Sequence, residues 1–299
     1  MSEKSTALQQ EPQRPLGSLS VLHDAPFAIE RTSVATPNTM KKHHYHNNYE
    51  LYYLYSGDRY YFIKDRTYHV KRGNLVLVKP YEIHSTSNYS KSGYDRCLIM
   101  FKRSFVAEVE ALMQGINLFE CCDRDIHIIP LDIQEQSFVE GLLFSMTNEF
   151  KAKDVGYEAF LKTAMTQILL IVSRHASQVK EDYASGLGAT HKTVSEVAAY
   201  INNNYNEDIT LSGISERFFI SPCYFSRIFK RVTGISFNEY LNGVRVKEAQ
   251  RLLASTDESV AAIGEAVGYK SSTHFGRSFM CIAGMSPSEY RRIKRGPRA

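Results

Sequence analysis

The sequence is poor in cysteine, and the few cysteines it has show no pairing pattern. Its 299 residues include five, an odd number without any CxxC spacing: Cys97, Cys121, Cys122, Cys223 and Cys281. This pattern argues against a disulfide framework and predicts reduced thiols in a cytoplasm. The adjacent pair Cys121-Cys122 could act in redox chemistry, although two ordinary loop thiols explain it more simply.

Long hydrophobic runs are also missing. No apolar segment approaches the roughly 18 residues of a membrane span, and the N-terminus has no signal-peptide core. An apolar content of 43% with 23% charged residues is typical of a soluble globular protein. We therefore expect a cytoplasmic protein with no membrane partner, long enough for two domains.

Positive charge is concentrated in the last third of the chain. Residues 190–299 hold 15 of the 36 Lys and Arg residues but only 10 of the 32 Asp and Glu residues. The net charge of +4 therefore comes from this region, as expected for a surface that contacts phosphate. An excess of this size does not by itself indicate nucleic-acid binding.

The same region contains a repeat. The segment 225–229 (FSRIF) resembles 275–279 (FGRSF), and three further matches follow at the same offset: Gly234 with Gly284, Ser236 with Ser286, and Glu239-Tyr240 with Glu289-Tyr290. A solenoid normally needs at least three repeats. Two copies predict two small helical modules joined by one helix.

The first copy has the pattern of a helix-turn-helix. Thr210 can cap a short helix, a turn follows at Phe219-Ile220, and Ser221 with Pro222 can begin a second helix. Apolar residues mark the buried face of this second helix, and its opposite face carries Cys223, Ser226, Arg227 and Lys230. Short side chains followed by cations suit a helix that enters the major groove of DNA.

The second copy repeats this plan with less charge. Ser271 can cap its second helix, whose outer face carries Thr273, Gly276, Arg277 and Met280. The apolar positions between the copies describe one connecting helix over about 240–253. A rigid connector would let both reading helices enter successive major grooves, about 34 Å apart.

Three longer motifs carry a family resemblance: GISFNEY at 234–240, IGEAVGY at 263–269 and GMSPSEY at 284–290. They resemble the signature of AraC/XylS-type transcription regulators over roughly the last hundred residues. The resemblance implies a bacterial-type, sequence-specific activator that binds double-stranded DNA and works with RNA polymerase. Its pattern places Cys223, Ser226, Ser272 and Thr273 near base edges, with Gly276 in the second reading helix.

Arg227 and Arg277 are the best candidates for base contacts, because a guanidinium can bond guanine O6 and N7 in bidentate fashion. Lys230 is expected to contact phosphate instead.

The first hundred residues have the pattern of strands. Five segments rich in Tyr, Val, Leu and Ile are separated by turn signals: 50–55, 59–63, 67–70, 74–78 and 95–101. Short strands at this spacing indicate a sandwich or barrel, and a jelly roll closes one compactly.

One stretch here matches the first metal motif of cupins. His44-x-His46, three residues, Glu50, six residues and Gly57 reproduce its spacing, and alternation places His44, His46 and Glu50 on one face. His84 could supply another imidazole from a later strand. Three histidines and a carboxylate would suit zinc, iron or manganese.

The second cupin motif departs from the metal-binding form, because Glu82 stands near the usual glycine and the spacing from Pro80 to His84 is one residue short. Sugar-sensing members of the resembled family use such residues to hydrogen-bond hydroxyls. We therefore predict no metal and no other cofactor, and an effector site made of His44, His46, Glu50, Tyr52 and His84. A bound metal is the alternative.

Tyrosines near this motif favour a polar ligand, because tyrosine combines an apolar face with a hydroxyl that can bond a sugar ring. They cluster with one arginine: Tyr45, Tyr49, Tyr52, Tyr53, Tyr55, Arg59, Tyr60 and Tyr61. The predicted partner is a small-molecule effector, a carbohydrate. Any single tyrosine here is explained equally well as a strand former.

Two helical segments follow the predicted barrel. Apolar residues recur at helical spacing over 138–150, beginning with a ladder of Phe138, Leu142 and Met146, and again over 157–172. Such wide stripes suit burial in the monomer or a homodimer contact, and we expect the dimer. A capping box at Thr193 and Glu196 is expected to open the reader.

The predicted fold class is a multidomain α+β protein, with a cupin-like jelly roll and following helices before an all-α double helix-turn-helix domain. The expected parts are a flexible arm (1–22), an effector-binding and dimerisation domain (23–178), a linker (179–192) and a DNA-binding domain (193–295). The predicted function is transcription regulation in response to a sugar, without enzyme activity. The competing hypothesis is a metal-dependent cupin enzyme with an appended DNA-binding domain. Sequence-independent DNA architecture would need wedge residues that are not evident.

Overall fold

The computed structural model describes residues 25–35, 46–90, 92–113, 115–176 and 188–295. A β-rich domain with attached helices, called the sensor here, occupies the chain up to Ala176. Seven further helices, from Ala189 to Arg295, form the reader. The predicted arm and most of the predicted linker lie outside the described residues, so neither prediction is tested. Among the described residues, no helix is long and apolar enough to cross a membrane.

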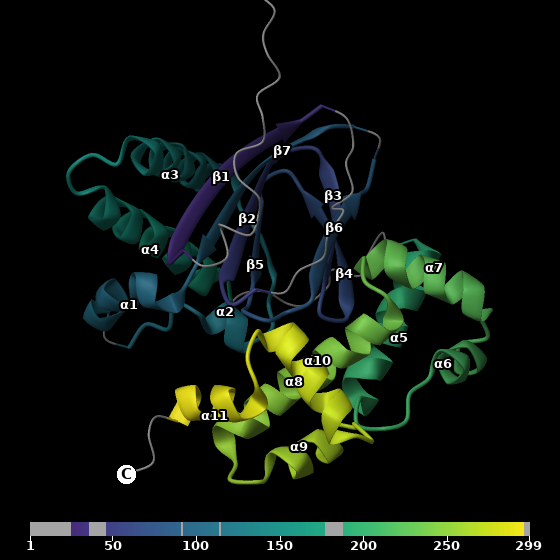
Figure 1. Cartoon of the computed structure of the whole chain (residues 1–299). Helices are drawn as coiled ribbons and strands as arrows, with labels where there is room; N and C mark the ends of the chain where they lie inside the picture. The colour runs from purple at the N-terminus through teal and green to yellow at the C-terminus, as the bar shows by residue number, and fades with distance from the viewer. Residues whose placement is uncertain (1–24, 36–45, 91, 114, 177–187, 296–299) are drawn as a thin grey trace, which may run out of the picture.

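The sensor consists of two antiparallel sheets that face each other (Figure 1). The larger has the strand order β1-β7-β2-β5-β8 and the smaller the order β4-β3-β6. The strands are β1 (Phe27–Val34), β2 (Tyr49–Ser56), β3 (Asp58–Ile63), β4 (Arg66–Lys71), β5 (Asn74–Val78), β6 (His84–Asn88), β7 (Tyr94–Phe101) and β8 (Ile128–Pro130). All five strand segments expected from the sequence are confirmed within one or two residues at each end.

The larger sheet is buried on both faces, and strand β2 shows why. Leu51 and Tyr53 belong to the core shared with the helices, whereas Tyr52 and Leu54 belong to the core between the two sheets. Alternation along the strand therefore sends one set of side chains to each core. This double burial explains the nearly continuous apolar runs in β2, β5 and β7.

Helices cover the outer face of the larger sheet (Figure 1). They are α1 (Arg103–Leu112), α2 (Glu120–Asp123), α3 (Ile133–Ala152) and α4 (Tyr157–Ala176). A capping box between Asp132 and Glu135 fixes the start of α3. The expected ladder on α3 is partly wrong: Met146 is buried, but Phe138 is 49% exposed, and Val139 and Leu143 face the core instead.

The reader has the predicted pair of helix-turn-helix modules joined by one helix. Its helices are α5 (Ala189–Asn204), α6 (Leu211–Arg217), α7 (Pro222–Thr233), α8 (Phe237–Ser255), α9 (Val260–Ala266), α10 (Ser272–Ala283) and α11 (Pro287–Arg295). The expected caps are confirmed, since the side chains of Thr210, Ser221 and Ser271 accept hydrogen bonds from the first turns of α6, α7 and α10.

The expected capping box at Thr193 is wrong. Helix α5 starts at Ala189 with Gly188 as its N-cap, and the Thr193 hydroxyl donates to the carbonyl of Ala189 from within the helix. The boundary erred because a polar segment with glycines resembles a linker until its helix packs. That helix contacts β4, where the backbone N–H of Thr67 donates to Ser195 Oγ at 3.2 Å.

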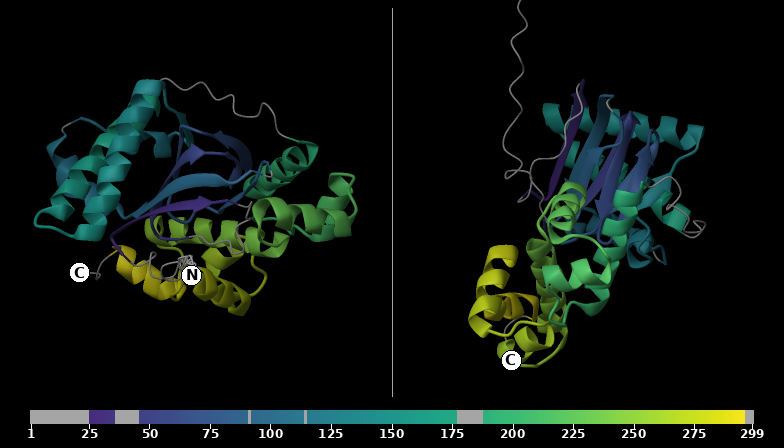
Figure 2. Two further views of the ribbon diagram at one scale, coloured as in Figure 1. Left: turned by 90° about the horizontal axis from the view of Figure 1, so that it is seen from above. Right: turned by 90° about the vertical axis from the view of Figure 1, so that its right-hand side faces the viewer.

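The reader is docked on one end of the sensor and shares a core with it. Phe62 of β3 and Ile83, which precedes β6, lie in the same apolar cluster as the first reader module. The Ser85 hydroxyl also donates to the carbonyl of Val232, in the last turn of α7, at 2.9 Å. Figure 2 shows that the reader and the helices α3 and α4 occupy different sides of the two sheets.

Candidate DNA interface and effector site

The outer face of α7 has the composition expected of a reading helix. Phe225, Ile228, Phe229 and Val232 are buried in the first module. The four residues predicted to face DNA are all exposed: Cys223, Ser226, Arg227 and Lys230. The two short side chains lie near the N-terminus and the cations lie further along, so the tip of the helix can approach base edges. The docked sensor leaves this face uncovered.

Helix α10 presents a plainer surface. Ser272, Thr273 and Arg277 are exposed, and Gly276 is half-buried with nothing within 4 Å of the position a Cβ would take. Met280 is 47% exposed. The second module therefore offers one cation, Arg277, on the predicted face, where the first module offers two.

A buried arginine of α8 joins the two modules, and the sequence did not reveal it. Arg245 is 9% exposed, and its guanidinium donates to the carbonyls of Tyr205 and Glu207, both at 2.8 Å. Its guanidinium carbon also lies 5.5 Å from the ring centroid of Tyr269 in the second module. These contacts brace the loop after α5 against the turn after α9, and so help to fix the separation of α7 and α10. The only signal was an arginine at a buried position of the connector.

Part of the basic excess is used inside the reader. Arg295 of α11 pairs with Asp257 at 2.6 Å, and its guanidinium also donates to the carbonyl of Thr256. Arg291 contacts the carbonyl of Glu258. These cations hold α11 against the loop after α8, so the count of basic residues overstates the charge available to phosphate.

The predicted effector residues that the structure describes meet at the end of β2. Nε2 of His46 and Nε2 of His84 lie 3.2 Å and 3.3 Å from the same atom, Glu50 Oε2. All three residues are buried, with exposures of 5%, 1% and 1%. Strand β6 brings His84 into place, because it pairs with β3 beside the larger sheet. His44 lies outside the described residues.

Two more polar groups belong to this cluster. The hydroxyl of Tyr61 on β3 donates to the other oxygen of Glu50, and the sequence gave no way to separate Tyr61 from its neighbouring tyrosines. Tyr52, which was predicted, lies edge-on to Tyr61 with ring centroids 5.4 Å apart. Its buried hydroxyl has no hydrogen-bond partner among the described residues, and burial raises its pKa. That hydroxyl is available to a ligand.

The backbone sets the tautomers of both histidines. Nδ1 of His46 lies 2.9 Å from the carbonyl oxygen of Asn48, and Nδ1 of His84 lies 2.8 Å from that of Glu82. A carbonyl oxygen only accepts, so each Nδ1 carries a hydrogen and each Nε2 faces the carboxylate. A proton or a cation between Nε2 and Glu50 satisfies both sides.

The charges of Glu50 and His84 support each other. Burial opposes ionisation of Glu50, but the adjacent His84 and His46 hold its pKa well below its usual range. Burial likewise opposes a charge on His84, but the Glu50 carboxylate raises the pKa of that ring above its ordinary value of 6.5. The two groups therefore favour an ion pair.

The donor set also suits a metal ion. Zinc holds histidine and carboxylate ligands at about 2.0–2.2 Å, which in a tetrahedron separates neighbouring ligand atoms by about 3.3 Å. The two separations from Glu50 Oε2 to the imidazole nitrogens, 3.2 Å and 3.3 Å, match this value. Geometry alone thus permits both chemistries.

A second acidic group lies nearby and already contains a cation. Glu82, Asp125 and His127 come together, and the ammonium of Lys79 sits among them. It pairs with Asp125, lies 3.6 Å from Glu82 and donates to the carbonyl of Cys122 at 2.9 Å. Lys79 thus supplies the charge that a metal would otherwise bring.

Two family profiles match the chain: an AraC-like ligand binding domain over residues 26–144 and a helix-turn-helix domain over residues 214–293. The HTH-type transcriptional activator RhaS of Pectobacterium atrosepticum is 24% identical over 259 residues, which are 86% of this chain and 89% of that protein. The melibiose operon regulatory protein of Escherichia coli K12 is 22% identical over 273 residues, covering 86% and 85%. A crystal structure of apo ToxT from Vibrio cholerae covers 90% of this chain and 98% of its own, with 15% identity and a TM-score of 0.41.

Proposed function

The chain belongs to the AraC family of transcription regulators and is a DNA-binding regulator with a ligand-binding domain; we propose that it is an activator whose effector is a sugar. The observation that supports the effector is the cluster of His46, Glu50, Tyr61 and His84 beside the unpaired hydroxyl of Tyr52. Donors and acceptors on aromatic walls are what a hydroxyl-rich ring requires. One relative is named for the melibiose operon.

The effector contacts proposed here are direct hydrogen bonds rather than bonds to a metal. Glu50 and His84 already balance each other's charge, and the raised pKa of His84 favours the protonated ring. A histidine must be neutral to coordinate a metal. His44, His46, Glu50, Tyr52 and His84 form the proposed effector set, to which the structure adds Tyr61.

A panel of carbohydrates should contain compounds that raise the melting temperature of the full-length protein. A ligand that binds only the folded state stabilises it by about 2.7 kcal/mol at a hundredfold excess over Kd. In transcription assays with purified RNA polymerase, the same compounds should raise output from a promoter that carries the selected operator. A panel in which only lipophilic compounds raise the melting temperature would contradict the sugar proposal.

We also propose a homodimer formed through the outer side of α3. Ile133 and Phe144 are 84% and 61% exposed, and eleven residues place them on one side of the helix. An exposed apolar stripe of this kind is typical of an association surface.

Replacing Phe144 by glutamate should convert the dimer to a monomer, because a charge on the stripe would lose its hydration in the interface. Sedimentation equilibrium at micromolar concentration measures this. The matched control is Leu112→Glu on α1, a side chain that is 81% exposed and lies on another helix. A wild-type protein that sediments as a monomer at these concentrations would refute the dimer, and a dimeric Phe144→Glu protein would move its interface elsewhere.

A further inference from the structure

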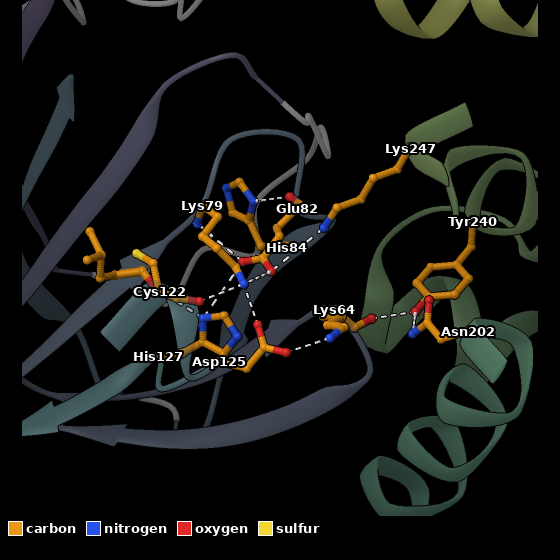
Figure 3. Close-up of polar contacts among 11 residues, drawn as sticks. Lys64, Lys79, Glu82, His84, Cys122, Asp125, His127, Asn202, Tyr240 and Lys247 are labelled. Carbon is orange, nitrogen blue, oxygen red and sulfur yellow. Dashed lines mark hydrogen bonds and ion pairs between the residues drawn. The ribbon is translucent and has the colours of Figure 1, made fainter. Parts of the chain in front are cut away.

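Three consecutive residues of the sensor serve both proposed sites. His84 pairs with Glu50 in the effector cluster, and its Nδ1 is held by the carbonyl of Glu82. Ile83 and the carboxylate of Glu82 face the other way and contact the reader (Figure 3). The segment Glu82-Ile83-His84 is called the coupling segment below.

One face of α8 receives this segment. Tyr240, Gly243 and Lys247 follow one another at helical spacing, at i, i+3 and i+7, on the helix that joins the two reading modules. The Tyr240 hydroxyl donates to the carbonyl of Lys64, whose own N–H donates to the carbonyl of Ile83 at 2.9 Å. The connector is therefore hydrogen-bonded to the backbone turn that also holds the coupling segment.

Glycine at position 243 is what allows the close approach. A Cβ at this position would lie 2.9 Å from Cδ1 of Ile83, closer than real side chains come. Glycine costs roughly 0.5–1 kcal/mol in the middle of a helix relative to alanine. Its place on the buried face of α8 is thus explained by the sensor rather than by the reader's own fold.

Lys247 supplies part of the charge that surrounds a buried anion. Glu82 is 1% exposed, and its Oε1 lies 3.6 Å from the ammonium of Lys79 and 3.8 Å from that of Lys247. No group in the described part of the chain donates a hydrogen bond to that oxygen. Displacing α8 would remove one of these two cations, so the position of the reader affects the energy of Glu82.

We propose that the coupling segment transmits the state of the effector site to the reader. An effector that changes the hydrogen bonds of His84 moves Ile83 and Glu82, and these move α8 and so the two reading helices it joins. A cavity of about 370 Å³ between the domains, lined by Ile83, Tyr240, Gly243 and Lys247 among others, gives α8 room to shift. The inference rests on the proposed function, because it takes His84 as an effector contact.

Reciprocity allows a test that needs no effector. If the effector site changes operator affinity, operator binding must change the effector site by the same factor. The probe is the DNA duplex that full-length wild-type protein selects from a random pool. The readout is amide hydrogen exchange of residues 82–88, which include His84. We expect saturating duplex to change exchange in this peptide by about fivefold or more in the wild type, the lower end of usual coupling.

Two variants of α8 should remove that response while still binding the duplex. Gly243→Leu inserts a side chain against Ile83, and Lys247→Met removes the cation beside Glu82 with little change in length. Lys270→Met is the matched control, because Lys270 forms an exposed pair with Asp208 at 2.6 Å within the reader. The control should respond like the wild type.

Each outcome decides something different. A wild type that binds no duplex refutes the proposed function. A wild type that binds duplex without any change at residues 82–88 refutes the coupling alone. Variants that bind duplex and respond fully would show that the α8 contacts do not carry the signal. Adding Ile83→Ala to Gly243→Leu should restore the response, because it makes room for the new side chain; a variant that was merely misfolded would not be rescued.

Discussion

Replacing Arg227 by alanine should cost about 1–3 kcal/mol of affinity for the selected operator and relax the choice of base at one position. The reason is geometric: Arg227 is exposed on α7, on the face opposite Phe225, Ile228 and Phe229, where a bidentate guanidinium can reach a guanine edge. Selection from randomised duplexes by the variant, followed by affinity measurements on single-base changes, measures the effect.

Lys230→Ala is the control, because it removes a cation from the same face one turn away. It should weaken binding to all sequences alike and reduce the salt slope by about one. An Arg227→Ala protein that lost affinity evenly across all sequences would contradict base reading by Arg227. In the second module, where Arg277 is the one cation on the predicted face, the corresponding Arg277→Ala change should relax a different base position.

The reader could be predicted from the sequence almost element by element. Its information is local: caps at Thr210, Ser221 and Ser271 act within one turn, and apolar spacing of 3.6 residues defines each buried face. The error at Thr193 is also local, because a serine or threonine near a helix start can equally bond backward inside the helix, as the bond to Ala189 shows.

The docking of the two domains could not be predicted in this way. Gly243 reads as a weak point in a helix, and Lys247 reads as a solvated cation. Their meaning depends on Ile83 and Glu82, more than 150 positions earlier in the chain. Arg245 was missed for the same reason, since its partners lie about forty residues before it.

The effector cluster lies between these cases. Strand parity correctly placed His46 and Glu50 together, and the motif correctly proposed His84 as their neighbour. Tyr61 could not be chosen from several tyrosines, because the pairing of β3 with β6 decides which one lies next to His84. Whether the site holds a metal is not determined by spacing, since the same distances serve an ion pair and a tetrahedral ligand set.

Freshly purified protein should carry no stoichiometric zinc, iron or manganese, and chelators should leave its response to the effector unchanged. His46→Ala should nevertheless cost about 1–3 kcal/mol of effector affinity, the usual value for a buried hydrogen-bonding group that loses its partner. Elemental analysis and titration calorimetry measure both. A full metal site that disappears in His46→Ala would contradict direct hydrogen bonding and would make the enzyme hypothesis worth testing.

The pH dependence of stability separates the two chemistries most sharply. Glu50→Gln keeps the shape of the side chain but leaves the buried charge of His84 unpaired, a loss of about 3 kcal/mol or more. The pKa of Glu50 is lowered, so its contribution is present above its ordinary value of 4.5 and is lost only as pH falls through the lower folded value. The pKa of His84 is raised, so its contribution is complete below 6.5 and is lost as pH rises through the higher folded value.

The stability difference between wild type and Glu50→Gln should therefore be largest between about pH 4.5 and 6.5 and shrink as the pH rises further. Other buried histidines, such as His127 and His191 with their lowered pKa values, affect both proteins alike and cancel in the difference. A metal site predicts the opposite slope, because neutral imidazoles bind metal better as the pH rises. Denaturant unfolding of both proteins from pH 5 to about 8 gives the sign of that slope, and a difference that grew with pH would overturn the ion pair in favour of the metal.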